Sequence, residues 1–357
     1  MVRDRTKHSR RKILTVGAGA LASTFMINRG SAAARELRIL IAGGSWRDWF
    51  HETFAQPFAQ AKGIELTYRL GLTFEPMVMA QRRSPQWDVI HENQNTSSAL
   101  GGMGLLKPWS ADRIPNVAKI HPSFRYEFLV GKIHTPYGMC VNTRQIRTPV
   151  DSWTAMWDPA VRGKVGFPAW NWIGNEVFYA INQTLGGTTE NIDPGIARFK
   201  ELFRTNQAKV VNNVEHARQL LLADEVWIMP HFGARTEQAA AAGAPVEFVI
   251  PKEGGLSWIF NTSLIGGRPQ DSIALAEEFV NTTLDAEKQL RFARLTGYPP
   301  TNVDAMNNLP ADLAKLRMSD ADVQALGRLQ REFDYNALFA YRDQHVERWN
   351  REVIAGS

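Results

Sequence analysis

Aromatic, acidic and amide side chains stand directly after two of the apolar runs in this chain of 357 residues. Trp46 and Asp48 follow the run at residues 37–41, and Glu92 and Asn93 follow the run at residues 87–90. Ligand crevices in open α/β sheets lie beyond the carboxyl ends of strands, so these side chains are candidates for the rim of a cleft. Indole rings attract cations and carboxylates pair with ammonium groups. Both loops are therefore candidates for the lip of a ligand crevice.

No catalytic constellation accompanies these residues. The sequence contains no Gly-x-Ser-x-Gly elbow and no Gly-Lys-Ser/Thr phosphate loop. Neither His51 nor His91 has a second histidine at metal-binding spacing. Cys140 is the only cysteine and lies in an apolar stretch, where a small buried side chain is expected. We therefore expect no catalytic residue, no metal site and no cofactor.

The segments that must position these side chains alternate between short apolar runs and amphipathic stretches. This order predicts an α/β fold with parallel strands joined by crossover helices. Strands are expected at residues 37–41, 64–70, 87–90, 164–167, 209–211, 226–229 and 245–250. Helices are expected at residues 48–62, 171–185, 193–204, 214–223 and 234–242, with Asp193 as an N-cap.

Two α/β regions joined by two extended crossings predict a two-lobed architecture, in which each lobe is a sheet flanked by helices and two strands form the hinge. About 320 residues after the leader exceed what a single core usually supports. We assign one lobe to residues 35–137 with 258–310 and the other to 143–250. The hinge crossings are placed at 138–142 and 251–257, and a C-terminal helical buttress at 311–357.

Residues 1–34 predict a removable export signal. Arg10 and Arg11 precede an apolar run at residues 13–27, which is too short for a bilayer core of about 30 Å. Small residues up to Ala34 suit a signal peptidase, and the paired arginines favour the twin-arginine route. A buried helix or an uncleaved anchor is the alternative, but such a helix should carry a polar face. We expect a soluble periplasmic protein that begins near Arg35.

The basic character of the full sequence belongs to this leader. Residues 1–34 carry seven of the 41 Lys and Arg side chains and one of the 36 Asp and Glu side chains. The remaining 34 basic and 35 acidic groups give a net charge of −1. No polybasic patch argues for a nucleic-acid partner or an anionic membrane.

With these residues in place, the chain resembles the periplasmic solute-binding proteins of bacterial ABC importers, in particular the spermidine/putrescine-binding group of the extracellular solute-binding family. The segments that carry the resemblance are residues 149–165, 251–258 and 297–302. The resemblance implies the type II periplasmic-binding-protein architecture, with a cleft that closes around one solute by hinge motion. It also implies delivery to an ABC permease in the inner membrane by a protein that we expect to be a monomer.

The resemblance also extends the set of candidate binding residues. In polyamine-binding members, aromatic walls hold the methylene chain and carboxylates pair with the ammonium groups. Trp46, Trp258 and Tyr298 match those rings. Polyamine-binding members place an Asp two residues after the tryptophan that corresponds to Trp258, and this chain has Phe260 at that position. The full set of candidates is Trp46, Asp48, Glu92, Asn93, Trp170, Asn171, Trp258, Phe260 and Tyr298.

The charge of the expected solute stays open. Trp170 and Asn171 stand where polyamine binders use acids, and the acidic candidates that remain are Asp48, Glu92 and Glu176. A polyamine-like amine, a flat neutral metabolite, a zwitterion and a small organic acid are all compatible with this set. The alternative to a binding protein is a secreted enzyme on the same scaffold, with Glu92 or Glu176 as general base.

Overall fold

The computed structural model describes residues 35–71 and 73–356, so the expected export signal lies outside the described residues. The strands are β1 Glu36–Ile41, β2 Glu65–Leu70, β3 Val89–Asn93, β4 Leu106–Lys107, β5 Arg125–Tyr126, β6 Leu129–Asn142, β7 Gly166–Pro168, β8 Lys209–Val211, β9 Ile228–Phe232, β10 Val246–Val249 and β11 Leu256–Ile265. The α-helices are α1 Ser45–Phe50, α2 Gln56–Lys62, α3 Glu75–Ala80, α4 Gln94–Gly102, α5 Asn175–Thr184, α6 Asp193–Arg204, α7 Val214–Leu222, α8 Gly233–Ala241, α9 Gln270–Thr283, α10 Ala286–Thr296, α11 Val303–Asn307, α12 Asp320–Ala325 and α13 Tyr335–Arg348.

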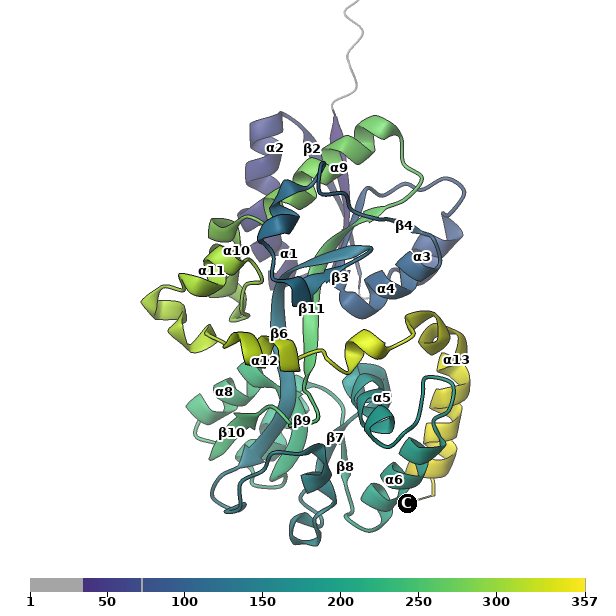
Figure 1. Ribbon diagram of the computed structural model, residues 1–357, viewed down its shortest axis with the longest axis vertical. Coiled ribbons are helices and arrows are strands. Elements are labelled where there is room, and N and C mark those ends of the chain that lie inside the picture. The colour runs from purple at the N-terminus through teal and green to yellow at the C-terminus, as the bar shows by residue number, and fades with distance from the viewer. Residues whose placement is uncertain (1–34, 72, 357) are drawn as a thin grey trace, which may run out of the picture. The chain divides into compact units, whose positions relative to one another are not determined.

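These strands form a mixed sheet with helices on its faces, which confirms the α/β expectation (Figure 1). The main path through the sheet is β10-β6-β11-β3-β1-β2, and β7 and β8 form a separate parallel pair. Strand β1 runs parallel to both β2 and β3, whereas β6 and β11 run antiparallel to each other. None of the helices in the described part of the chain is long and apolar enough to cross a lipid bilayer.

The long strand β6 changes its partners near its middle. Its first half pairs with β11, and its second half pairs with β9 and β10. Tyr137 belongs to both sets, because it pairs with Leu256 of β11 and with Phe232 of β9. One continuous backbone thus links two groups of strands, and the proposed hinge crossings at 138–142 and 251–257 lie next to this change of partners.

Two large apolar clusters lie on either side of this change. The first, which we call the β1 core, contains Leu37, Ile39, Phe50, Phe279 and Phe292. The second, which we call the α5 core, contains Trp153, Phe167, Phe178, Phe199 and Trp349. Burial of each large side chain of this kind contributes about 1.5–3 kcal/mol to stability, so each cluster holds its own set of helices on the sheet.

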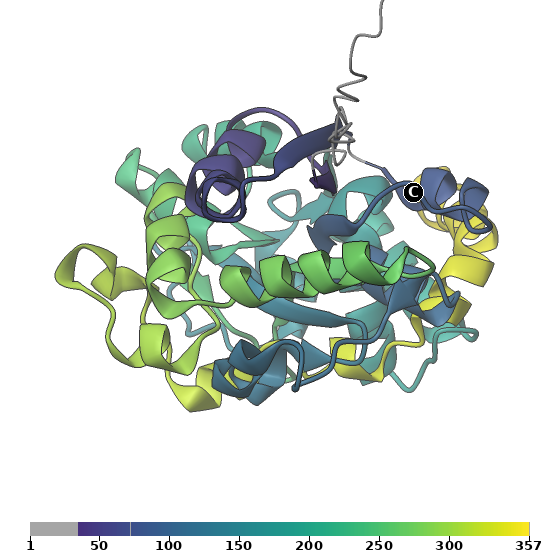
Figure 2. The ribbon, with the colours of Figure 1, turned by 90° about the horizontal axis from the view of Figure 1, so that it is seen from above.

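The segment from α11 to α13 passes from one side of the sheet to the other, across the level of β6 and β11 (Figures 1 and 2). Two hydrogen bonds fasten it to the start of β11. The Gly327 amide donates to the Gly255 carbonyl over 2.9 Å, and the Ser257 amide donates to Gln330 Oε1 over 2.7 Å. Farther along, Trp349 anchors the end of the chain in the α5 core.

The structure differs from the sequence expectation at several element boundaries; for example, β9 covers residues 228–232 where a strand was expected at 226–229. Residues 91–95, which follow the strand expected at 87–90, are the end of β3 and the start of α4, and the Asn93 side chain caps that helix by accepting from the amides of Asn95 and Thr96. The helix expected from residue 171 begins as a π-helical turn, η6 (Trp170–Gly174), before α5. Asp193 is the first residue of α6 and its N-cap is Ile192.

Candidate functional site

A cavity of about 500 Å³ lies between residues of α3, α4 and β11 on one side and residues of η6 and α5 on the other. Helix α13 lines it as well. Cavities of about 300–1,000 Å³ suit small organic ligands. Asn95 and Thr96 in the first turn of α4, and Asn175 and Glu176 in the first turn of α5, line the cavity.

Four of the nine residues proposed from the sequence line this cavity, namely Asn93, Trp170, Asn171 and Trp258. Trp170 is buried in the α5 core, while Asn171 is exposed. Trp258 is half-buried, and its ring centroid lies 6.3 Å from that of Phe232. The cavity therefore has indole walls on both sides.

Trp46, Phe260 and Tyr298 come together, but they do not line this cavity. The Trp46 ring centroid lies 4.7 Å from that of Phe260, and the stacked rings of Phe260 and Tyr298 lie 5.8 Å apart. The Trp46 indole donates to His91 Nε2 over 2.9 Å. These rings pack against the β1 core, and the Trp46 indole N–H is used within the protein.

The acidic candidates Asp48 and Glu92 also lie away from the lining. Asp48 is exposed and pairs with its neighbour Arg47 over 3.0 Å. Glu92 is half-buried, and its carboxylate accepts from the Asn93 amide. Burial, followed by the nearby charge of Glu75, raises the pKa of Glu92 to about 7 against the opposing effect of that hydrogen bond.

Glu176 brings a buried carboxylate to the cavity. It is the second residue of α5 and 7% of its surface is exposed. Asn95, at the start of α4, donates its side-chain amide to Glu176 Oε1 across the cavity. Burial raises the pKa of Glu176 to about 7, although hydrogen bonds from the backbone and from Asn95 act in the opposite direction.

Two buried acceptor oxygens at this contact have no donor. In the part of the chain that the structure describes, neither Glu176 Oε2 nor Asn95 Oδ1 has a hydrogen-bond partner. A buried acceptor without a donor costs about 1–3 kcal/mol, so both oxygens favour a ligand that donates N–H groups. Within residues 35–71 and 73–356, no group of three His, Cys, Asp or Glu side chains is placed to hold a metal ion.

The face that α13 turns towards the cavity was not among the candidates. It contributes Tyr335, Phe339, Arg342 and Val346, together with Leu338. These positions recur at intervals of three and four residues, which is the period of one helix face. That pattern was visible in the sequence, where it predicted packing and gave no indication that a cavity lay beneath the helix.

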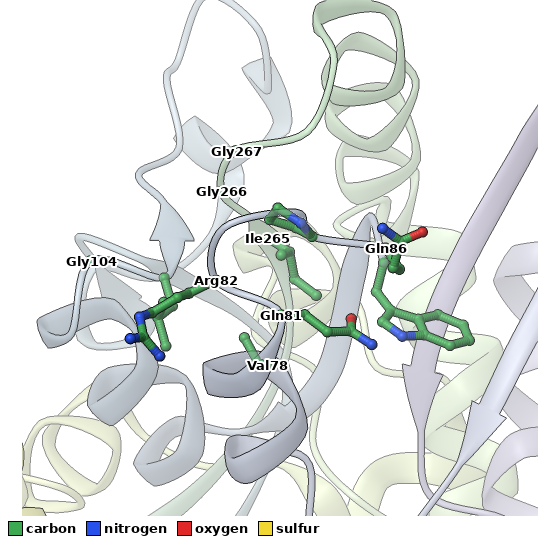
Figure 3. A pocket seen from close by; sticks show the side chains of 11 residues that line it. Val78, Gln81, Arg82, Gln86, Gly104, Ile265, Gly266 and Gly267 are labelled. Carbon is green, nitrogen blue, oxygen red and sulfur yellow. The ribbon is translucent and has the colours of Figure 1, made fainter.

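Two other cavities contain none of the nine candidates. One of about 120 Å³ lies beside Arg82, Gln86 and Ile265 (Figure 3). The other, of about 390 Å³, lies between α8 and the turn that holds Gly297 and Pro299. The larger cavity beneath α13 is therefore the candidate site.

The sequence matches a known protein family. Residues 53–317 match the family described as bacterial extracellular solute-binding protein. The spermidine/putrescine-binding periplasmic protein 1 of Haemophilus influenzae is 21% identical over 80% of this chain and 81% of its own length.

Solved structures agree on the fold. A spermidine/putrescine ABC transporter substrate-binding protein of Streptococcus pneumoniae has a TM-score of 0.67 at 19% identity, covering 88% of this chain and 98% of its own. A GABA receptor, Atu4243, has a TM-score of 0.66 at 22% identity, covering 88% of this chain and 96% of its own. Periplasmic binding proteins of the type II fold are thus the structural neighbours.

Proposed function

Since this chain belongs to the bacterial extracellular solute-binding protein family, we propose that it captures a small organic solute carrying an ammonium group and delivers it to an ABC permease. The observation that carries the proposal is the pair of buried acceptor oxygens, Glu176 Oε2 and Asn95 Oδ1. An ammonium group has three donors and a positive charge, so it can satisfy both oxygens and pair with the carboxylate.

The walls of the cavity support the same solute class. Trp170, Trp172 and Trp258 line it, and a cation held against such rings gains on the order of 0.5–2 kcal/mol per contact. The relatives named for spermidine and putrescine, and the neighbour named for GABA, are named for molecules that carry primary amines. In this proposal the solute is bound and released without chemical change.

The expected export signal at residues 1–34 determines the compartment in which the proposed function takes place. Removal of residues 1–34 after export would leave a monomeric binding protein in the periplasm, with its first residue near Arg35. Sequencing the N-terminus of secreted material checks this step, because a mature chain that retains Met1 contradicts it.

Calorimetric titration with primary amines, diamines and ω-amino acids tests the binding function. We expect saturable binding of at least one amine to the unaltered protein, and about a tenfold or greater loss of affinity in Glu176→Gln, which keeps the side-chain shape but not the charge. Glu127→Gln removes an exposed carboxylate elsewhere and serves as the control. Equal affinity in all three proteins contradicts the role of Glu176. A solute that is chemically changed after prolonged incubation favours the enzyme alternative.

A further inference from the structure

The charges around the candidate cavity are arranged unevenly. Glu176 is buried, whereas Arg342 is 60% exposed at its side chain and Asp343 is 92% exposed. Arg342 is the one cationic side chain among the described residues that line the cavity. The cavity thus has a carboxylate in its buried part and a guanidinium at the solvent side.

Among the described lining residues, Glu176 is the buried carboxylate. Glu75 also lines the cavity, but its two oxygens already accept from the Thr96 hydroxyl and from the Phe74 amide. Asp343 is almost fully exposed, and an exposed carboxylate adds little binding energy. A diammonium solute would therefore find one fully buried partner for its two charges.

The guanidinium of Arg342 is held in place with most of its donors unused. Its central carbon lies 5.2 Å from the centroid of the Phe339 ring, which itself lines the cavity. Its Nε donates to Asp343 over 3.4 Å, a long contact between neighbouring exposed residues. Among the described residues no acceptor bonds its two terminal nitrogens. The planar guanidinium can therefore donate two parallel hydrogen bonds to the two oxygens of a carboxylate.

We propose that Arg342 determines specificity at this cavity by selecting solutes with an ammonium group at one end and a carboxylate at the other, in preference to diamines. The inference rests on the proposed function, because it takes the ammonium group to bind at Glu176. The second ammonium group of a diamine would lie beside the guanidinium, where like charges repel. A carboxylate at the same place would gain a bidentate, charge-assisted pair.

Titrations with solutes of matched length test this inference. For each chain length from three to six carbons, an ω-amino acid, the diamine and the monoalkylamine are compared on the unaltered protein, on Arg342→Gln and on Arg147→Gln. Arg147 is exposed and does not line the cavity, so its variant controls for the loss of one positive charge. Thermal unfolding of each variant verifies that folding is intact.

We expect the ω-amino acid to bind the unaltered protein more tightly than the diamine of equal length. Because the guanidinium is partly exposed, Arg342→Gln should lower its affinity about threefold to fivefold, leave the monoalkylamine within about twofold, and leave the diamine unchanged or tighter. A uniform loss for all three solutes, or no change, overturns the selection by Arg342 while amine binding stands. Failure of every amine to bind the unaltered protein overturns both this inference and the proposed function.

Discussion

Lys132 is a fully buried amine at the centre of the β1 side of the sheet. Its Nζ lies 2.7 Å from His91 Nδ1 and 2.7 Å from the Thr262 hydroxyl, and in the part of the chain that the structure describes no carboxylate pairs with it. The Trp46 indole can only donate, so His91 Nε2 accepts and the imidazole proton resides on Nδ1. That proton is donated to the Asn261 carbonyl over 2.6 Å, so Nδ1 has no lone pair left for an ammonium group at Lys132, and the neutral amine is the form that fits.

Replacing Lys132 by Met should therefore stabilise the protein. Burial lowers the pKa of Lys132 well below its usual value, so the unfolded chain binds a proton that the folded chain does not. The stability of the unaltered protein then falls as the pH falls below about 10, by up to about 1.4 kcal/mol per unit. Lys132→Met should remove this slope and gain on the order of 1 kcal/mol or more near neutral pH.

Denaturant unfolding at about pH 9 and about pH 6 measures both effects. The exposed Lys119→Met variant serves as the control, because it loses an amine that is solvated in both states. If the stability of Lys132→Met depends on pH as steeply as that of the unaltered protein, Lys132 carries its charge when folded and the hydrogen-bond assignment is wrong.

The pKa of Glu176 predicts how the binding of an amine depends on pH. Its pKa of about 7 in the empty cavity means that part of the protein carries a neutral carboxyl group at neutral pH. Since an ammonium group prefers the ionised form, affinity should rise by up to about tenfold per pH unit below pH 7 and level off above it. Titrations in buffers of different ionisation enthalpy should detect up to about one proton released per solute bound. Glu176→Gln should show no such release.

At the scale of elements, the segment between α12 and α13 depends on a buried amide. Gln330 is 2% exposed, and its Oε1 accepts from the Ser257 amide at the start of β11. Because α13 follows directly, this bond also fixes where the helix lies over the cavity. The element that carries Arg342 is thus positioned by a contact with the central strands.

Truncating Gln330 to Ala should leave the Ser257 amide buried without an acceptor, which costs about 1–3 kcal/mol of stability. The free energy of unfolding from urea titration measures this loss. Gln324→Ala shortens an exposed glutamine six residues earlier and should change stability by less than about 0.5 kcal/mol. Equal losses in the two variants would show that the buried hydrogen bond contributes nothing beyond the side-chain truncation.

The order of the strands and helices was predictable because it depends on local periodicity, whereas the site depends on distances that periodicity does not give. Trp258 and Phe260 are two residues apart on β11, so both point to the same face. The strand advances about 7 Å between them, which carries Phe260 to the rings of Trp46 and Tyr298 while Trp258 lines the cavity. Tertiary packing decides which of the two can reach a solute.

At the scale of the whole molecule, the proposed hinge and the cavity are linked through the contact between Asn95 and Glu176. Strand β6 changes partners at Tyr137, and the side chains of Asn95 and Glu176 meet across the cavity. A protein that closes by rotation about β6 and β11 would make this contact when closed and lose it when open. Changing the charge of one partner therefore alters the balance between the two states.

Replacing Asn95 by Asp should favour the open form of the ligand-free protein and raise its affinity for an amine. Loss of the Asn95 amide and the added negative charge raise the pKa of Glu176 further in this variant. At a pH well above that raised pKa, two carboxylates would face each other across the empty cavity, at a cost on the order of 1–3 kcal/mol. An ammonium group between them would pair with both, so the bound form should be closed and its affinity higher. Small-angle scattering should show a larger radius of gyration for the empty variant than for the unaltered protein, and a fall when an amine is added.

Asn95→Ala is the matched control, because it removes the hydrogen bond without adding a charge. It should open the empty protein less than Asn95→Asp and should lower the affinity for amines, since nothing replaces the lost acceptor. If scattering from the empty protein is the same for Asn95→Asp, Asn95→Ala and the unaltered chain, the two groups of strands do not move about Tyr137. The cavity would then take up its solute by motion of α13 or of side chains alone.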